Sequence, residues 1–156
     1  MRLLIIRHAR AADANGVADS QRPLTLEGRR EFEAVTRWVV SQGAAPSHVL
    51  HSPALRTTET AQILAATSGL APHACDVVSW LALGNSCEDI VPNLQSPSAD
   101  VIALVGHEPT MSALASSLAG GGWLSFRPGT IACLEFESAI GPGLGKLHWL
   151  VDASMF

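Results

Sequence analysis

Short apolar runs alternate along this chain with longer amphipathic segments. The apolar runs are almost continuous, which is typical of strands buried on both faces of a sheet. The segments between them have apolar positions three to four residues apart, or many small residues, as helices that pack on a sheet do. The predicted strands are 2–6, 48–52 and 100–106, and the predicted helices are 25–41, 54–67 and 107–120.

The first predicted helix has clear boundaries. Thr25 is a suitable N-cap, because its hydroxyl can accept a hydrogen bond from the first helical turn. Phe32, Val35 and Val39 then recur at helical spacing and should face the sheet. Gly43 follows as a stop signal.

The alternation of strand and helix predicts an α/β fold. We expect one domain over residues 1–156, with three layers, α/β/α, in which helices cover both faces of a mostly parallel central sheet. Two weaker elements are expected in 70–100: a short strand near 77–78 and a short helix near 88–94. The segments 130–137 and 146–152 predict a terminal hairpin.

Composition and charge limit the classes of function. The 156 residues are 47% hydrophobic and 15% charged, with a formal net charge of −4. An acidic chain is a poor ligand for a polyanion, so we expect no nucleic acid partner. No apolar run approaches the ~18–20 residues that span a bilayer, so we expect no membrane partner. Cys75, Cys87 and Cys133 lack disulfide or metal-ligand spacing, and we expect free thiols in a cytoplasmic, monomeric protein.

Basic and imidazole side chains follow all three predicted strands. In a parallel sheet the carboxyl ends of the strands meet at one edge, where the functional crevice lies. Arg7 and His8 end the first strand, Arg56 follows the second, and His107 follows the third. Each could be a solvated charge or a structural histidine when taken alone. Together they would repel one another unless an anion lay between them.

This cluster predicts a site for a tetrahedral oxyanion such as phosphate. Arginine binds phosphoryl oxygens in a bidentate manner. Helix N-termini just after Ser52 and Gly106 would add backbone N–H donors. A neutral imidazole is also a nucleophile near neutral pH, so His8 could accept a phosphoryl group. A metal site is the weaker interpretation, because arginines disfavour a bound cation and no carboxylate stands at ligand spacing.

The motifs resemble those of a known family. The segments "RH" at 7–8, "HSPALRTTETA" at 51–61 and "VGHEP" at 105–109 are similar to the three signatures of the histidine phosphatase superfamily, which has the phosphoglycerate mutase-like fold. Ala9 stands where the family usually has glycine. The short chain and "RPLTLEGRREFEAV" at 22–35 resemble the SixA-type phosphohistidine phosphatases.

The resemblance implies roles for individual residues. His8 would be the phosphoryl-accepting nucleophile, and Arg7, Arg56 and His107 would complete the phosphate pocket, with no metal and no cofactor. Arg22 matches the R-P-L-T segment, where it would contact the substrate or form a structural ion pair. The roles of Glu108, whose side chain we expect to point away from the site, of Ser52 and of the loop 10–23 stay open.

A missing carboxylate indicates the substrate class. Many members of the superfamily carry an acidic proton donor after the second helix, but residues 77–87 contain no carboxylate and Glu88 and Asp89 come late. An alcohol leaves poorly without a proton, since its pKa is close to the ~15.7 of water. An imidazole, with a pKa of ~6.5, leaves easily.

The absence of an acid therefore favours a phosphohistidine over a phosphate ester. Short loops predict an open pocket that admits a phosphotransfer or histidine-kinase-type domain as protein partner. The alternatives are a small-molecule or broad-specificity phosphomonoesterase and a non-catalytic domain that binds phosphate or a phosphoprotein.

Overall fold

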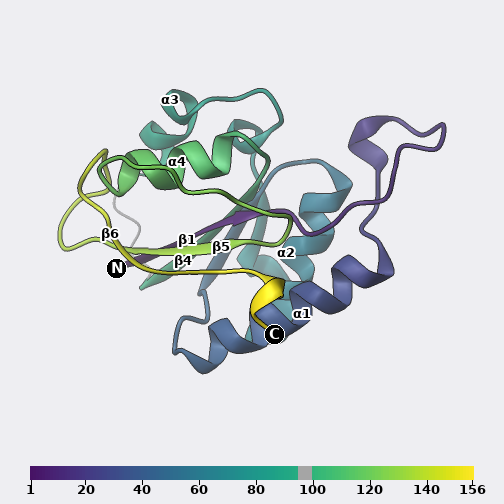
Figure 1. Ribbon diagram of the computed structural model, residues 1–156, viewed down its shortest axis with the longest axis horizontal. Coiled ribbons are helices and arrows are strands. Elements are labelled where there is room, and N and C mark those ends of the chain that lie inside the picture. Colours follow the sequence, from purple (N-terminus) through teal and green to yellow (C-terminus); the bar gives the residue numbers. More distant parts are fainter. Residues whose placement is uncertain (95–99) are drawn as a thin grey trace.

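A six-stranded sheet forms the centre of the computed structural model, which describes residues 1–94 and 100–156. The strand order is β3-β2-β4-β1-β5-β6. The strands are β1 (Arg2–Arg7), β2 (His48–His51), β3 (Cys75–Val77), β4 (Val101–Gly106), β5 (Ile131–Glu135) and β6 (Lys146–Val151). The helices are α1 (Leu26–Ser41), α2 (Leu55–Ser68), α3 (Cys87–Ile90) and α4 (Thr110–Leu118) (Figure 1).

The sheet is mostly parallel, as predicted. Strands β1 and β4 pair in parallel, and β2 pairs in parallel with both β4 and β3. Among the strands of the described residues, only the terminal hairpin departs from this pattern, since β5 is antiparallel to β1 and to β6. In the register, Arg7 lies beside Gly106 and His51 lies beside Val105. The three central strands therefore end level with one another, and the residues that follow them emerge at one edge.

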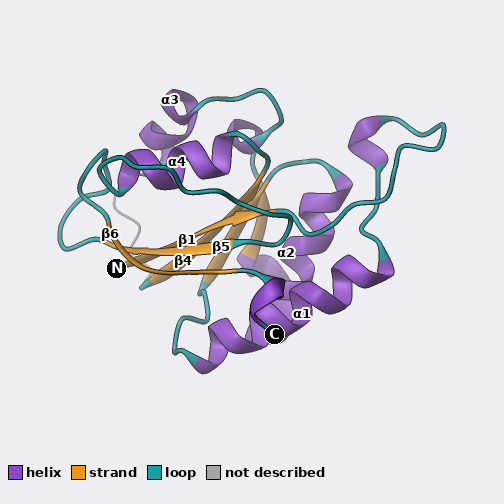
Figure 2. Ribbon diagram, in the orientation of Figure 1, coloured by secondary structure: helices purple, strands orange, loops and turns teal. Residues whose placement is uncertain are grey.

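Helices cover both faces of this sheet and give the predicted three layers (Figure 2). Along β1, Leu4 and Ile6 belong to the core on the side of α1 and α2. Leu3 and Ile5 belong to the core on the side of α3 and α4. All four are fully buried, and each such side chain contributes about 1.5–3 kcal/mol on burial. Strand β1 thus anchors both halves of the core and holds the residues that follow it in place.

Helix α1 begins where the sequence predicts. The Thr25 hydroxyl accepts a hydrogen bond from the Gly28 amide at 2.9 Å, and this is the expected cap. The Thr25 amide donates to the carbonyl of Arg10 at 2.9 Å. Gly28 is buried against the same residue, and a Cβ placed there would lie 2.5 Å from the Arg10 carbonyl oxygen. The start of α1 is therefore packed directly on the segment that follows His8.

Several boundaries differ from the predicted ones. Helix α4 begins at Thr110 rather than at 107, because residues 107–109 form a turn in which Pro109 is the N-cap. The N-terminus expected just after Gly106 therefore lies farther along the chain. Strand β3 spans Cys75–Val77, so it overlaps the predicted strand near 77–78 but begins and ends earlier. Of the described helices, none is long and apolar enough to cross a membrane.

The close approach at Gly28 gives a test of this packing. Glycine to alanine inside a helix normally stabilises it by up to about 1 kcal/mol. Here we expect Gly28→Ala to lower the free energy of unfolding by about 1–3 kcal/mol, because the new methyl group meets backbone that must shift. Urea denaturation measures the change. The exposed Arg30→Ala on the same helix is the control and should change stability by less than about 0.5 kcal/mol; a stabilised Gly28→Ala variant would contradict the packing.

Candidate active site

The structure brings the four predicted residues together where the central strands end. Arg7 is the last residue of β1, His107 follows β4, and Arg56 lies in the first turn of α2. The His8 amide donates to the Gly106 carbonyl at 3.0 Å, which extends the β1–β4 ladder to the site. The rings of His8 and His107 have centroids 5.4 Å apart. Their roles in the reaction remain predictions.

His8 has the tautomer that a nucleophile requires. Its Nδ1 lies 2.8 Å from the carbonyl oxygen of Ala9, and only a protonated nitrogen can donate to a carbonyl. The Nε2 atom therefore keeps its lone pair. Burial lowers the pKa of His8 to about 4, and the positive charges of Arg56 and Arg7 act in the same direction. The ring is consequently neutral at neutral pH and able to attack phosphorus.

His107 is buried, with only 3% of its surface exposed, and is held on both sides. Its Nε2 lies 2.8 Å from the Ser52 hydroxyl, and its Nδ1 lies 3.4 Å from Nη2 of Arg56. Because a guanidinium can only donate, Nδ1 is the acceptor and Nε2 carries the proton. Burial and then the charge of Arg56 lower the pKa of His107 to about 4. A bound anion would favour the protonated ring, whose Nδ1–H could then donate to it.

Both arginines have an unused donor in this site. Arg7 donates through Nη1 to the Phe126 carbonyl at 2.7 Å, and Arg56 donates through Nη1 to the Asp19 carbonyl at 2.8 Å. The Nε atoms of Arg7 and Arg56 are buried and have no hydrogen-bond partner among the described residues. Such orphaned groups are uncommon and costly in folded proteins. An oxyanion bound beside the two guanidinium groups would offset their positive charge.

Asp19 is the main residue that the sequence analysis missed. Its Oδ2 accepts from Nη2 of Arg56 at 3.0 Å, and its Oδ1 accepts from Nη1 of Arg22 at 3.0 Å. The hydrogen bonds from Arg22 and Arg56 lower the pKa of the Asp19 carboxyl group, so it stays ionised at neutral pH. The spacing of Asp19 and Arg22 was a possible signal, but a loop has no periodicity to show which residues face a site.

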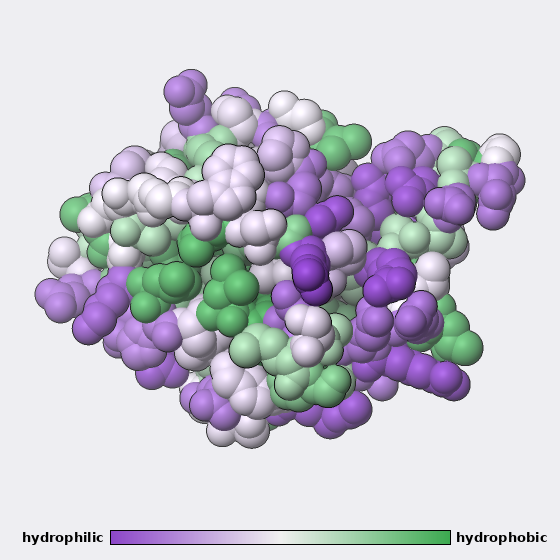
Figure 3. All heavy atoms as spheres, viewed as in Figure 1, coloured by the Kyte–Doolittle hydropathy of each residue, from purple (hydrophilic) through white to green (hydrophobic). Residues whose placement is uncertain are grey.

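Arg22 forms the structural ion pair that was one of its two expected roles. Besides Asp19, it holds the carbonyl oxygen of Ala12 at 2.7 Å through Nε. The loop 10–23 contains a short 3-10 turn at Asp19–Gln21. It projects outward near the N-terminal end of α2 (Figure 1). Hydrophilic residues predominate on the side from which it projects (Figure 3). Asp19 and Arg22 therefore fasten this loop to the arginine of the site.

Two hydroxyl groups complete the support of the site. Ser52, whose role the sequence left open, fixes the ring of His107. Thr60 accepts from the Ala9 amide at 3.1 Å and donates to the Arg56 carbonyl at 2.6 Å. Thr60 thus joins the segment after β1 to helix α2. It stands in a run of threonines, and nothing in that run distinguishes it from its neighbours before the fold is known.

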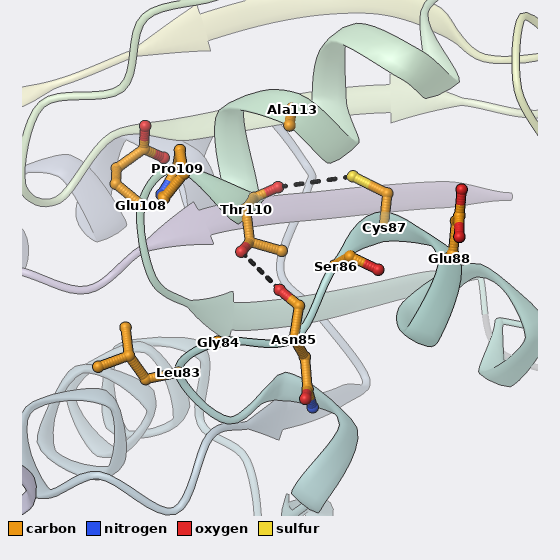
Figure 4. Close-up of a pocket in the computed structure, with 10 residues that line it drawn as sticks. All are labelled: Leu83, Gly84, Asn85, Ser86, Cys87, Glu88, Glu108, Pro109, Thr110 and Ala113. Carbon is orange, nitrogen blue, oxygen red and sulfur yellow. Dashed lines mark hydrogen bonds between the residues drawn. The ribbon is translucent and has the colours of Figure 1, made fainter.

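Glu108 directly follows His107 but is held by the next helix. Its carboxylate accepts from the Ser112 amide at 3.0 Å and from the Ser112 hydroxyl at 2.6 Å. Glu108 also lines a cavity between α4 and the loop before α3 (Figure 4). Among residues 1–94 and 100–156, no group of three or more His, Cys, Asp and Glu side chains could hold a metal ion.

Comparisons with known proteins identify the family. A family model for the histidine phosphatase superfamily (branch 1) matches residues 3–84. The chain is also 36% identical over 126 residues to an uncharacterized protein of Picosynechococcus, and this match covers 78% of the chain and 74% of the relative. The chain therefore belongs to the histidine phosphatase superfamily.

SixA proteins are among the relatives and the structural neighbours of this chain. The chain is 28% identical over 153 residues to the phosphohistidine phosphatase SixA of Escherichia coli, covering 96% of this chain and 92% of that protein. A solved structure of the protein histidine phosphatase SixA complexed with tungstate superposes with a TM-score of 0.86, at 25% identity and 99% coverage of both chains. The predicted resemblance and the phosphoglycerate mutase-like fold are confirmed, and the family supports phosphatase activity.

The state of the two histidines can be measured directly. In the oxyanion-free protein we expect His8 to stay neutral above pH about 4 and to become protonated as the pH falls through that value, because burial and Arg56 oppose the charge. Histidine-selective NMR titration checks this, with His8→Ala to assign the signal. Inorganic phosphate should raise the pKa of both His8 and His107. A free-state pKa near the usual ~6.5 for His8 would contradict the described environment.

Proposed function

We propose that this protein is a phosphohistidine phosphatase that acts through a covalent intermediate on His8. One observation carries the proposal: a neutral imidazole with a free Nε2 lies beside two guanidinium groups whose buried Nε–H donors lack partners. The donors fit a phosphoryl group and the imidazole fits a nucleophile. The family supports the phosphatase reaction, and the finer substrate class is our inference from the chemistry of the site.

In the first step Nε2 of His8 attacks phosphorus and the bond to the leaving group breaks. Arg7 and Arg56 bind the non-bridging oxygens and stabilise the charge that develops on them. His107, protonated when the anion is bound, donates to the same oxygens. In the second step water attacks phospho-His8, releases inorganic phosphate and restores the free imidazole.

The leaving group supports a substrate with a P–N bond. Asp19 is the carboxylate bound to Arg56, and its lowered pKa keeps it ionised, so it is unsuited to protonate an alkoxide. An imidazole needs no such donor, because its far ring nitrogen can carry the proton itself. The reference pKa of the imidazole ring is ~6.5. A phosphohistidine on a phosphotransfer or histidine-kinase-type domain fits this requirement. We propose that the reaction requires neither a metal nor a cofactor and takes place in the cytoplasm on a monomeric enzyme.

Substrate preference tests this proposal. We expect the protein to hydrolyse a phosphohistidine-bearing protein and small phosphoramidates with kcat/KM at least about 10-fold above that for alkyl phosphates, because an alkoxide lacks a proton donor. Phosphate release from a panel of both substrate classes, with and without a chelator, measures the preference. A preference for alkyl esters would instead indicate a phosphomonoesterase of the same superfamily, and sensitivity to the chelator would contradict metal independence.

Removal of the nucleophile tests the mechanism. His8→Ala should lower kcat/KM by at least about 10³-fold, since it removes the nitrogen to which the phosphoryl group is transferred. His73→Ala, which removes an exposed histidine outside the site, is the matched control and should retain activity within about 2-fold. Steady-state kinetics with a phosphoramidate measures both variants. Full activity in His8→Ala would contradict the covalent mechanism, and an inactive wild-type protein that binds phosphate would indicate a binding domain.

A further inference from the structure

A cavity of about 670 Å³ begins at the residue after His107. Its walls are the loop at 83–88 and the start of α4, and the Thr110 hydroxyl joins them by donating to the Asn85 carbonyl at 2.8 Å. Glu108, Pro109 and Leu83 lie at one end of the cavity and Glu88 lies at the other (Figure 4). The end with Glu108 is the one that adjoins the catalytic edge of the sheet.

The Glu108 carboxylate is held in place and still has acceptor capacity. Its two partners, the amide and the hydroxyl of Ser112, are neutral donors. A carboxylate has about four lone-pair positions, so roughly two remain for another donor. Glu108 forms no ion pair with the residues that the structure describes. Burial lowers the pKa of Arg7, and the negative charge of Glu108 partly opposes this by favouring the charged guanidinium. The charge of Glu108 is therefore felt at Arg7, the last residue of β1.

The other carboxylate near the site, that of Asp19, already has cationic partners. Asp19 accepts hydrogen bonds from two guanidinium groups, Arg22 and Arg56, which compensate its charge. Glu108 therefore differs from Asp19 in having a charge without a cationic partner. A cationic N–H donor delivered beside the phosphate site would find such a partner here.

We propose that Glu108 is a specificity residue that accepts a hydrogen bond from the far ring N–H of the leaving imidazole. Leu83 and Pro109 would pack against the ring, since both present apolar surface at the same end of the cavity. This inference rests on the proposed function and deepens it. It explains how the site could distinguish a phosphoimidazole from a phosphate ester.

The electrons and protons balance without a proton donor. The P–N bond breaks, its electron pair goes to the leaving ring nitrogen, and a P–Nε2 bond forms on His8. The far nitrogen keeps its proton throughout, so a cationic phosphoimidazole ring leaves as neutral imidazole. A carboxylate beside that N–H favours the protonated, reactive ring. An aryl phosphate offers the carboxylate neither an N–H donor nor a positive charge.

The experiment compares two variants on two substrates. Glu108→Gln removes the charge at nearly constant shape, and Glu88→Gln makes the same change at the opposite, exposed end of the cavity. The substrates are N-phosphoimidazole and p-nitrophenyl phosphate. We expect Glu108→Gln to lower kcat/KM for phosphoimidazole about 10-fold and to leave aryl phosphate hydrolysis within about 2-fold, which also shows that the variant is folded. Glu88→Gln should leave both rates within about 2-fold.

The outcomes separate this inference from the function on which it rests. An unchanged ratio of the two substrates in Glu108→Gln, with phosphoimidazole hydrolysed by the wild type, overturns the role of Glu108 alone. A wild-type protein that does not hydrolyse phosphoimidazole overturns the proposed function and this role with it. A phosphoimidazole methylated on its far nitrogen lacks the N–H, and the effect of Glu108→Gln should shrink on it. An equally large effect would overturn the hydrogen bond.

Discussion

The site depends on the repulsion between positive groups that the sheet holds at one edge. The strands β1, β2 and β4 end in register, so the residues that follow them cannot move apart without disrupting the ladder. Burial and the charge of Arg56 then lower the pKa of His8 and of His107 to about 4. The positive charge of the arginines, which helps to keep both rings neutral in the free site, favours a bound oxyanion, and the oxyanion offsets the repulsion.

This constraint links the fold to the chemistry. The four central residues of β1 are fully buried between two cores, and the hydrogen bond from the His8 amide to Gly106 continues the pairing of β1 with β4 into the site. The Nδ1 contact with Ala9 then determines which nitrogen of His8 carries the proton. His8 is thus positioned by backbone, while the arginines and the second histidine are positioned by side-chain contacts from neighbouring elements.

Much of this arrangement could be predicted from the sequence, and the reason is geometric. Continuous apolar runs indicate buried parallel strands, and the carboxyl ends of parallel strands lie at one edge of a sheet. The sequence alone therefore predicts that four residues lie together there: Arg7, His8, Arg56 and His107. The supporting contacts could not be predicted in this way. Asp19 lies on an irregular loop, and Thr60 is one of several similar residues, so neither has a periodic pattern that shows its direction.

The central claim is that the phosphoryl group passes through His8, and rapid-quench trapping tests it most directly. The wild-type protein would be mixed with a radiolabelled phosphoramidate, quenched in alkali within the first turnover and mapped by mass spectrometry. The account predicts an acid-labile, alkali-stable phosphate on the imidazole of His8, which disappears as inorganic phosphate is released. Turnover with no label on the protein, or with the label on another residue, would contradict it.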